Sequence, residues 1–281
     1  MTVRADTPGG DDGAEFARQL TEGSASLAVA RDERALFASD VHLSPREPQT
    51  AQWFLQALQR HGREADHLFL LGDLFEVWVG DDDDEPLGAQ LLEVLTELSG
   101  RGVRVRLMRG NRDFLLDSPL PGAATSPFSV RCGAMLLPDP VTLDLHGTRT
   151  VLTHGDALCT DDVGYQAWRR TCRDPRWQQA FLSRTLAERR ALARHARDHS
   201  ESDKSGKAEY LMDVNPLAVL RLFDASGADL MIHGHTHRPA SHRLEHAGRT
   251  LQRTVLTDWD SAARRGAMLW IERGEQRLLQ P

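Results

Sequence analysis

The sequence His67-Leu-Phe-Leu-Leu-Gly-Asp73 decides the fold of this chain, because four consecutive apolar residues lead directly into a glycine and a carboxylate. A strand with one face in water would alternate polar and apolar residues, so this run predicts a strand buried on both faces. Asp73 then lies at the carboxyl end of the strand. In open α/β sheets, this is the end at which ligands bind.

Four other segments repeat this pattern, with strand-like residues followed by Asp, Asn or His. They are Ala35 to His42, Val103 to Asn111, Thr150 to Asp156 and Asp229 to His237. Because the carboxyl ends of neighbouring parallel strands meet at one edge, we expect these side chains to converge in space. Asp73 is the predicted centre of the group.

Helical spacing of apolar residues separates the first three strands. It occurs in residues 50–61 and 89–98 and predicts two crossover helices. Alternating strands and helices indicate βαβ units with a parallel sheet. Short strands with a turn at His146-Gly147 predict a second sheet between about 136 and 156, and we expect further strands from 228, near 251–256 and at 268–271.

The composition is that of a soluble globular protein, with 40% hydrophobic and 27% charged residues among 281. It contains no apolar run of the roughly 18 residues that span a bilayer and no signal-peptide pattern. Three cysteines without metal-site spacing predict reduced thiols in the cytoplasm. The net charge of −7 argues against a nucleic-acid partner, and no feature predicts an oligomeric state.

We predict a disordered leader at residues 1–32, one domain from residues 33–160 and 206–281, and an inserted helical lid at 161–205. Between Arg169 and Arg197 the insertion has nine arginines and two acidic residues, together with an apolar stripe. This combination suits a substrate with acyl chains and phosphates at an anionic membrane surface. The alternative is an ordinary basic helix face whose apolar stripe packs on the core.

The polar residues after the five strands could bind metal ions. They are Asp40, His42, Asp73, Asn111, His154, His235 and His237. Seven oxygen and imidazole ligands exceed the need of one tetrahedral zinc ion and suit two octahedral ions, of which Mn²⁺ is the most natural. Two dications about 4 Å apart repel by roughly 17 kcal/mol at an effective dielectric constant of ~20. A shared carboxylate offsets that repulsion, and Asp73 is the candidate.

Other acidic residues allow two readings. Five acidic residues run from Asp81 to Glu85, and we expect a solvated loop rather than a metal site. Asp113 and Asp156 either orient metal ligands or serve as caps and turn residues. We expect a structural role for Asp258 in Asp258-Trp259-Asp260.

The order of these motifs resembles the calcineurin-like metallophosphoesterases: Asp-x-His, Gly-Asp, Gly-Asn, a lone His and Gly-His-x-His. From Leu36 to Trp259 the chain is similar to one branch, the UDP-2,3-diacylglucosamine hydrolases. The segments that carry this similarity are Ser39–Leu43, Leu71–Glu76, Gly80–Asp82, Gly110–Leu115, His154–Asp156, Leu158–Asp162, Met212–Asn215 and Ile232–Pro239.

The resemblance implies a four-layer α/β/β/α sandwich with the inserted lid and two Mn²⁺ ions. One ion would be held by Asp40, His42, Asp73 and His237, and the other by Asp73, Asn111, His154 and His235. The implied substrate-binding residues are Asn111, Arg112, Asp162, Ser200, Lys207, His235, and Lys204 at a position where the family usually has Asn.

The implied reaction belongs to lipid A synthesis at the cytoplasmic face of the inner membrane. A hydroxide activated by two metals would hydrolyse the pyrophosphate of UDP-2,3-diacylglucosamine, giving UMP and 2,3-diacylglucosamine 1-phosphate. Asp73, His154 and Arg112 are the implied catalytic residues.

Arg112 occupies a position at which many relatives carry a histidine that is read as a general acid. Arginine cannot take that role because it stays charged. A phosphate leaving group, with a second pKa near ~6, needs no such acid, whereas a guanidinium can bind its oxygens. Arg112 therefore favours pyrophosphate cleavage. The alternatives are another phosphodiesterase or nuclease of the superfamily, or a metal-stabilised scaffold that binds a partner without catalysis.

Overall fold

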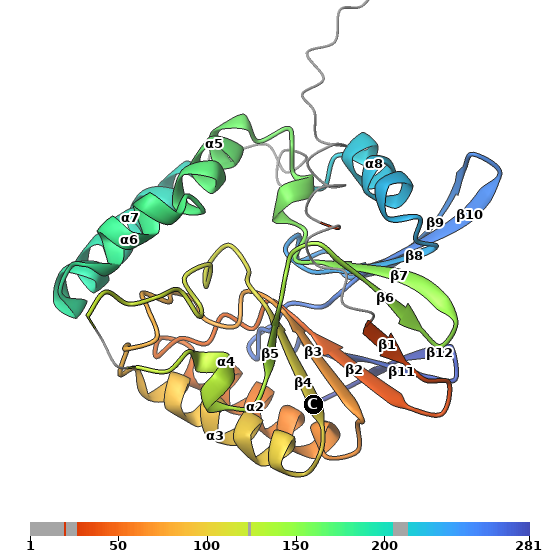
Figure 1. Ribbon diagram of the computed structural model, residues 1–281, viewed down its shortest axis with the longest axis horizontal. Helices are drawn as coiled ribbons and strands as arrows, with labels where there is room; N and C mark the ends of the chain where they lie inside the picture. The colour runs from red at the N-terminus through yellow and green to blue at the C-terminus, as the bar shows by residue number, and fades with distance from the viewer. Residues whose placement is uncertain (1–19, 21–26, 123–124, 205–212) are drawn as a thin grey trace, which may run out of the picture.

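The computed structural model describes residues 20, 27–122, 125–204 and 213–281, without the side chains of 198–204. Two six-stranded sheets pack face to face, and helices cover their outer faces (Figure 1). The predicted α/β/β/α sandwich is confirmed. None of the described helices combines the length and the apolar character that a membrane crossing requires.

The first sheet is built around the strand that contains His67 to Leu71. Its order is β12 Glu275–Leu279, β11 Met268–Glu272, β2 Arg34–Ala38, β3 His67–Leu71, β4 Arg104–Met108 and β5 Met135–Leu137. Strands β2 to β5 are parallel, and every residue of β3 is buried, as the apolar run predicts. Helices α2 (Pro48–Gly62) and α3 (Pro86–Gly100) are the two expected crossovers, and each begins at a proline.

The second sheet joins the segments that carry the histidines. Its order is β1 Leu27–Val29, β6 Val141–Leu145, β7 Thr148–Thr153, β8 Leu230–His233, β10 Arg249–Val255 and β9 Ala240–His246. Helix α8 (Pro216–Ser226) covers its outer face through a cluster that includes Leu222 and Met231. Between the sheets lies a separate core, in which the rings of Phe37 and Phe69 stack with centroids 4.7 Å apart.

Strand β1 lies inside the predicted disordered leader and corrects it. Leu27 to Val29 pair in parallel with Leu143 to Leu145, and Val29 is 2% exposed. Leu20 is also buried, against the α8 cluster. A run of three residues is too short to show periodicity in the sequence, and its partner strand lies more than a hundred residues downstream. The prediction is therefore wrong at 27–29, and the other residues before Leu27 lie outside the described part.

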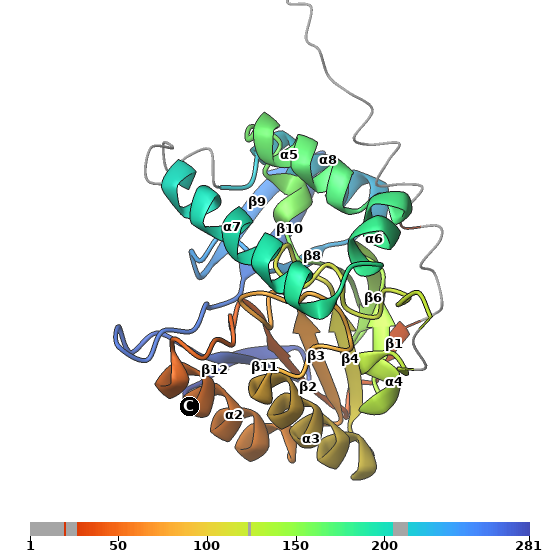
Figure 2. The same cartoon turned by 90° about the vertical axis from the view of Figure 1, so that its left-hand side faces the viewer.

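Three helices occupy the segment predicted as a lid: α5 Val163–Cys172, α6 Pro175–Leu182 and α7 Leu186–Lys204. Asp174 caps the start of α6, because its side chain accepts a hydrogen bond from Arg176 N. Figure 2 shows α6 and α7 above the ends toward which β3 and β4 point. Two short helices, α4 Phe128–Arg131 and the 3₁₀ helix η1 Asp156–Leu158, complete the described elements.

The acidic run from Asp81 to Glu85 is not the solvated loop that we expect from the sequence. Asp81 is buried and accepts hydrogen bonds from the Trp78 ring and the Phe128 N–H. Arg189 of α7, 2% exposed, donates to Asp82 at 2.8 Å. Two of these partners, Phe128 and Arg189, lie far away in the sequence, so the run alone could not reveal them.

Candidate metal centre

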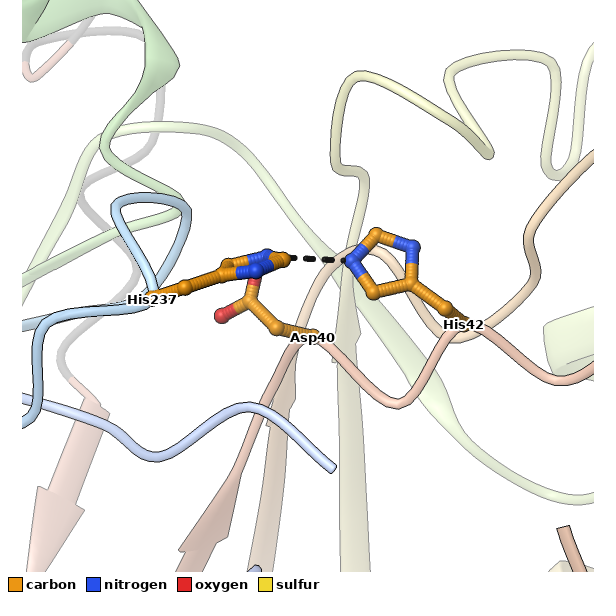
Figure 3. A group of neighbouring side chains, drawn as sticks. All are labelled: Asp40, His42 and His237. Carbon is orange, nitrogen blue, oxygen red and sulfur yellow. Dashed lines mark hydrogen bonds and ion pairs between the residues drawn. The ribbon is translucent and has the colours of Figure 1, made fainter. Parts of the chain in front are cut away.

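The loops after β2, β3, β4, β7 and β8 bring the seven predicted ligands together. Two groups of three have their ligand atoms within 4.8 Å of one another: Asp40, His42 and His237 (Figure 3), and Asp73, His154 and His235. Asn111 joins the second group, since its Oδ1 lies 3.0 Å from His154 Nε2 and 2.8 Å from His235 Nδ1.

Asp73 lies between the two groups. Its Oδ2 is 3.8 Å from His42 Nε2, and its Oδ1 is 3.6 Å from His154 Nε2. Each oxygen of this one carboxylate therefore faces a different group. This is the position that a bridging ligand requires.

The backbone at five of the seven positions is left-handed. The φ angles are 53° at Asp40, 51° at His42, 52° at Asp73, 70° at His235 and 54° at His237. Residues other than glycine seldom adopt this region, and it is held only where the surrounding structure imposes it. The turns after the strands thus hold the side chains in place at a local energetic cost.

Two glycines next to predicted ligands allow the loops to approach closely. A Cβ at Gly110 would lie 2.1 Å from Asp73 Oδ1, and a Cβ at Gly234 would lie 2.1 Å from Asp40 Oδ2. Any side chain there would displace a carboxylate. Steric crowding therefore explains why glycine precedes the ligand in the Gly-Asn and Gly-His motifs.

Carboxylates lie behind two of the histidine rings. Glu76 Oε2 lies 3.1 Å from His42 Nδ1, and Asp258 Oδ2 lies 3.5 Å from His237 Nδ1. A carboxylate on the far nitrogen fixes a ring so that its other nitrogen can bind a metal. The sequence alone does not predict that Glu76 or Asp258 supports a ligand. Glu76 lies in the quoted Leu71–Glu76 motif, which was a usable signal, whereas nothing local distinguishes Asp258 from a structural residue.

Asp113 fixes the backbone around Asp73. It accepts hydrogen bonds from Gly110 N at 2.6 Å and Leu74 N at 2.7 Å. Burial, together with the nearby charge of Asp73, raises the pKa of Asp113 to about 6. Of its two readings, the contacts favour the one in which Asp113 orients the ligand loops.

The charges at the centre favour cations. Burial lowers the pKa of His42 and of His235 to about 4, so both rings are neutral at pH 7 and keep a free lone pair. Burial opposes protonation of His154 too, but the carboxylates of Asp73 and Asp40 outweigh it and raise its pKa to about 9. The negative charge that holds a proton on His154 is charge that a metal ion would neutralise.

The donor set fits two divalent cations. It combines carboxylate oxygens, an amide oxygen and imidazole nitrogens, a mixture that suits octahedral first-row ions. His42 Nε2 and His237 Nε2 face each other at 3.2 Å beside Asp40, as two ligands of one ion would (Figure 3). The chemistry of the donors does not select one metal.

Arg112 lies beside the shared carboxylate. Its backbone N–H donates to Asp73 Oδ1 at 2.8 Å. Its side-chain Nε is buried and has no hydrogen-bond partner among the described residues. A buried guanidinium N–H without an acceptor is costly, so this group is suited to bind an anion.

The remaining predicted substrate-binding residues belong to the predicted lid, 161–205, and the segment after it. Asp162 caps α5 and accepts a hydrogen bond from Tyr165 N at 3.0 Å. Ser200 and Lys204 belong to α7, at positions whose side chains are not described. Lys207 lies outside the described residues.

Comparison with known proteins identifies the family of this chain. Residues 33–239 match the calcineurin-like phosphoesterase family. A Chromobacterium violaceum protein named UDP-2,3-diacylglucosamine hydrolase is 46% identical over 245 residues, which cover 86% of this chain and 97% of that protein. Proteins of the same name from Cellvibrio japonicus and Stenotrophomonas maltophilia strain K279a are 44% and 43% identical, over 80% and 85% of this chain and 90% and 95% of theirs. The chain therefore belongs to the calcineurin-like phosphoesterases and, within them, to the UDP-2,3-diacylglucosamine hydrolases.

Proposed function

We propose that this protein hydrolyses the pyrophosphate bond of UDP-2,3-diacylglucosamine, giving UMP and 2,3-diacylglucosamine 1-phosphate. The observation that supports this most directly is the shared carboxylate of Asp73, which faces two ligand groups and holds the backbone of Arg112. Relatives that match most of the chain carry the name of this activity.

Two metal ions would be held by the seven residues of the candidate centre, with Asp73 shared. Bound divalent cations lower the pKa of a water molecule and neutralise charge on a phosphoryl group. We propose Mn²⁺, because the ligands mix oxygen with imidazole nitrogen. Glu76, Asp258 and Asp113 would keep the ligands in place.

Arg112 would bind the phosphoryl oxygens of the substrate. Its buried Nε lacks an acceptor among the described residues, and a phosphate oxygen would supply one. A guanidinium can make two parallel hydrogen bonds to a phosphate. Because the leaving group is itself a phosphate, with a second pKa near ~6, no residue has to protonate it.

The lid would contact the acyl chains and the membrane surface. Val163 and Trp168 on α5 are 72% and 43% exposed, and Leu192 on α7 is 43% exposed. The same insertion contains nine arginines between Arg169 and Arg197. We propose peripheral binding at the cytoplasmic face of the inner membrane, where such a surface meets anionic lipid.

The test is to incubate the purified protein with Mn²⁺ and UDP-2,3-diacylglucosamine and to measure the release of UMP. We expect Asp73→Ala to lower the rate by on the order of a thousandfold or more, because both metal positions lose a ligand. Asp224→Ala, which removes a surface carboxylate on α8, is the matched control. Unchanged release in Asp73→Ala would contradict the proposal, as would hydrolysis of bis(p-nitrophenyl) phosphate by a protein that leaves the lipid intact.

A further inference from the structure

Asp156 is a buried carboxylate that holds the first helix of the lid. It lies in η1, two residues after His154, and is fully buried. Its Oδ2 accepts hydrogen bonds from Tyr165 Oη at 2.5 Å and Arg169 Nε at 2.8 Å, and Arg173 Nη2 lies 3.5 Å away. The three partners all belong to α5 or to its C-cap.

The same helix also contacts the backbone of both metal loops. Arg173 Nη2 donates to the carbonyl oxygen of Gly110, next to Asn111, at 3.0 Å. Gln166 Nε2 donates to the backbone oxygen of Asp156 at 2.8 Å. Helix α5 is therefore connected to the loops after β4 and β7, which carry ligands of the second group.

The site faces the metal centre. The ring of Tyr165 lies 6.1 Å from the ring of His235, centroid to centroid. Asp162, the predicted substrate-binding residue, caps the same helix. A shift of α5 would therefore move Asp162 and Tyr165 relative to the metal ligands.

Two cations face the buried carboxylate of Asp156. Arg169 Nε lies 2.8 Å and Arg173 Nη2 lies 3.5 Å from its Oδ2. Two guanidinium groups share one carboxylate, so the cluster keeps one positive charge in excess. Removing the carboxylate would leave two buried or half-buried cations facing each other, which is strongly unfavourable.

We propose that Asp156 is a positioning residue, which acts through Arg169 and Arg173 to hold α5 at a fixed place above the metal centre. The side-chain hydrogen bonds described for Asp156 Oδ2 come from α5 and not from a predicted metal ligand. By fixing α5 it sets the distance between the substrate-binding side chains of the lid and the ligands that face the phosphates. The kinetic part of this inference rests on the proposed function, whereas its structural part does not.

Hydrogen exchange tests the structural part on the whole protein without substrate. In Asp156→Asn we expect the amides of residues 163–172 to exchange at least roughly tenfold faster, with α2 and α3 unchanged. Tyr165→Phe, which removes one hydrogen bond, should have a smaller effect on the same amides. The matched control is Asp82→Asn, which removes the partner of Arg189 and should affect α7 rather than α5.

Steady-state kinetics test the positioning role. We expect Asp156→Asn to raise KM for UDP-2,3-diacylglucosamine roughly tenfold and to change kcat less than about threefold, because substrate and transition state lose the same contacts. Asp156→Glu, which keeps the charge, should recover part of the loss. Titration calorimetry should show Mn²⁺ affinity within about threefold of the wild type, since Asp156 contacts no side chain of a predicted ligand.

Three results would overturn the inference: unchanged exchange in α5, equally faster exchange in α2 and α3, or a fall in kcat with KM unchanged. If the wild-type protein does not act on the lipid, the proposed function fails. Exchange in α5 still decides whether Asp156 positions the helix.

Discussion

At the scale of single residues, Arg112 combines two contacts that serve different purposes. Its backbone N–H fixes Asp73, while its buried Nε is left for an anion. We expect Arg112→Lys to keep the backbone contact and the charge but to lose the paired hydrogen bonds of a guanidinium. The predicted result is a fall in kcat/KM for UMP release of roughly 10 to 100-fold.

The control for this prediction is Arg101→Lys, at the exposed end of α3, which should behave as the wild type. Equal kcat/KM for Arg112→Lys and the wild type would show that charge alone is needed at this position.

Glu76 is a second residue whose effect can be measured separately. It lies behind His42 and also pairs with Arg197 of α7. Because its carboxylate lies 3.1 Å from the far nitrogen of a predicted ligand, Glu76→Gln should weaken Mn²⁺ binding by roughly 10 to 100-fold. Titration calorimetry measures this directly, with Glu97→Gln on α3 as a control. An unchanged affinity would mean that the ring is held by packing alone.

At the scale of elements, strand β1 makes a testable addition to the fold. Val29 is 2% exposed in the core between the sheets. Val29→Ala should lower the free energy of unfolding by about 1 to 3 kcal/mol, because it removes buried methyl groups and leaves a cavity. Urea denaturation measures the loss. If residues 27–29 were disordered, the substitution would leave the free energy of unfolding unchanged. An unchanged free energy of unfolding would therefore contradict strand β1.

The elements that the sequence predicts well are those with strong local patterns. Strand β3 and helices α2 and α3 have uninterrupted or helically spaced apolar residues. Strands β9 and β12 escape prediction because they are mostly exposed edge strands with few apolar positions. The prediction of a solvated loop at Asp81 to Glu85 is wrong for another reason, since Arg189 and Arg190 pair with this run from a distant helix.

At the scale of the whole molecule, the metal centre joins loops from both sheets, so metal binding should stabilise the entire fold. A ligand at 100 times its Kd adds about 2.7 kcal/mol to the free energy of unfolding. We expect Mn²⁺ to raise Tm by several degrees, a chelator to reverse the change, and Asp73→Ala to abolish it. A Tm that does not respond to Mn²⁺ in the wild type would contradict a two-ion centre.

The acid stability of the protein should depend on Glu33, at the opposite end of the sheet. Burial opposes its ionisation, but hydrogen bonds from Ala30, Arg104 and His67 outweigh it and lower the pKa to about 2. A carboxyl group whose pKa is lowered on folding stabilises the fold at pH values above its ordinary pKa of 4.5. This contribution to stability is lost as the pH falls toward 2.

Glu33→Gln removes that contribution. Urea denaturation at pH 6 should give the wild type a free energy of unfolding about 1 kcal/mol higher than that of the variant, a figure reduced for solvent screening. This difference in the free energy of unfolding should shrink below pH 4.5. A constant difference from pH 6 to pH 3 would show that the effect is not one of charge.

The sequence predicts those residues of the candidate site that come directly after a strand. Asp73, Asn111 and His154 each follow a strand, and sheet topology brings them together. The residues that support them could not be found in this way. Asp258 reaches His237 from a loop after β10, and only the folded chain places the two side by side.

The left-handed turns of the ligand loops imply that the cradle formed by the ligand residues has its final shape before a cation binds. Glycine contacts and the hydrogen bonds of Asp113 fix these turns from within the protein. An ion that enters a rigid site has little chain to order, so less of its binding energy is spent on rearrangement. The protein should accordingly release and regain its ions repeatedly without refolding, and ions whose preferred spacing departs from that of the cradle should be held poorly.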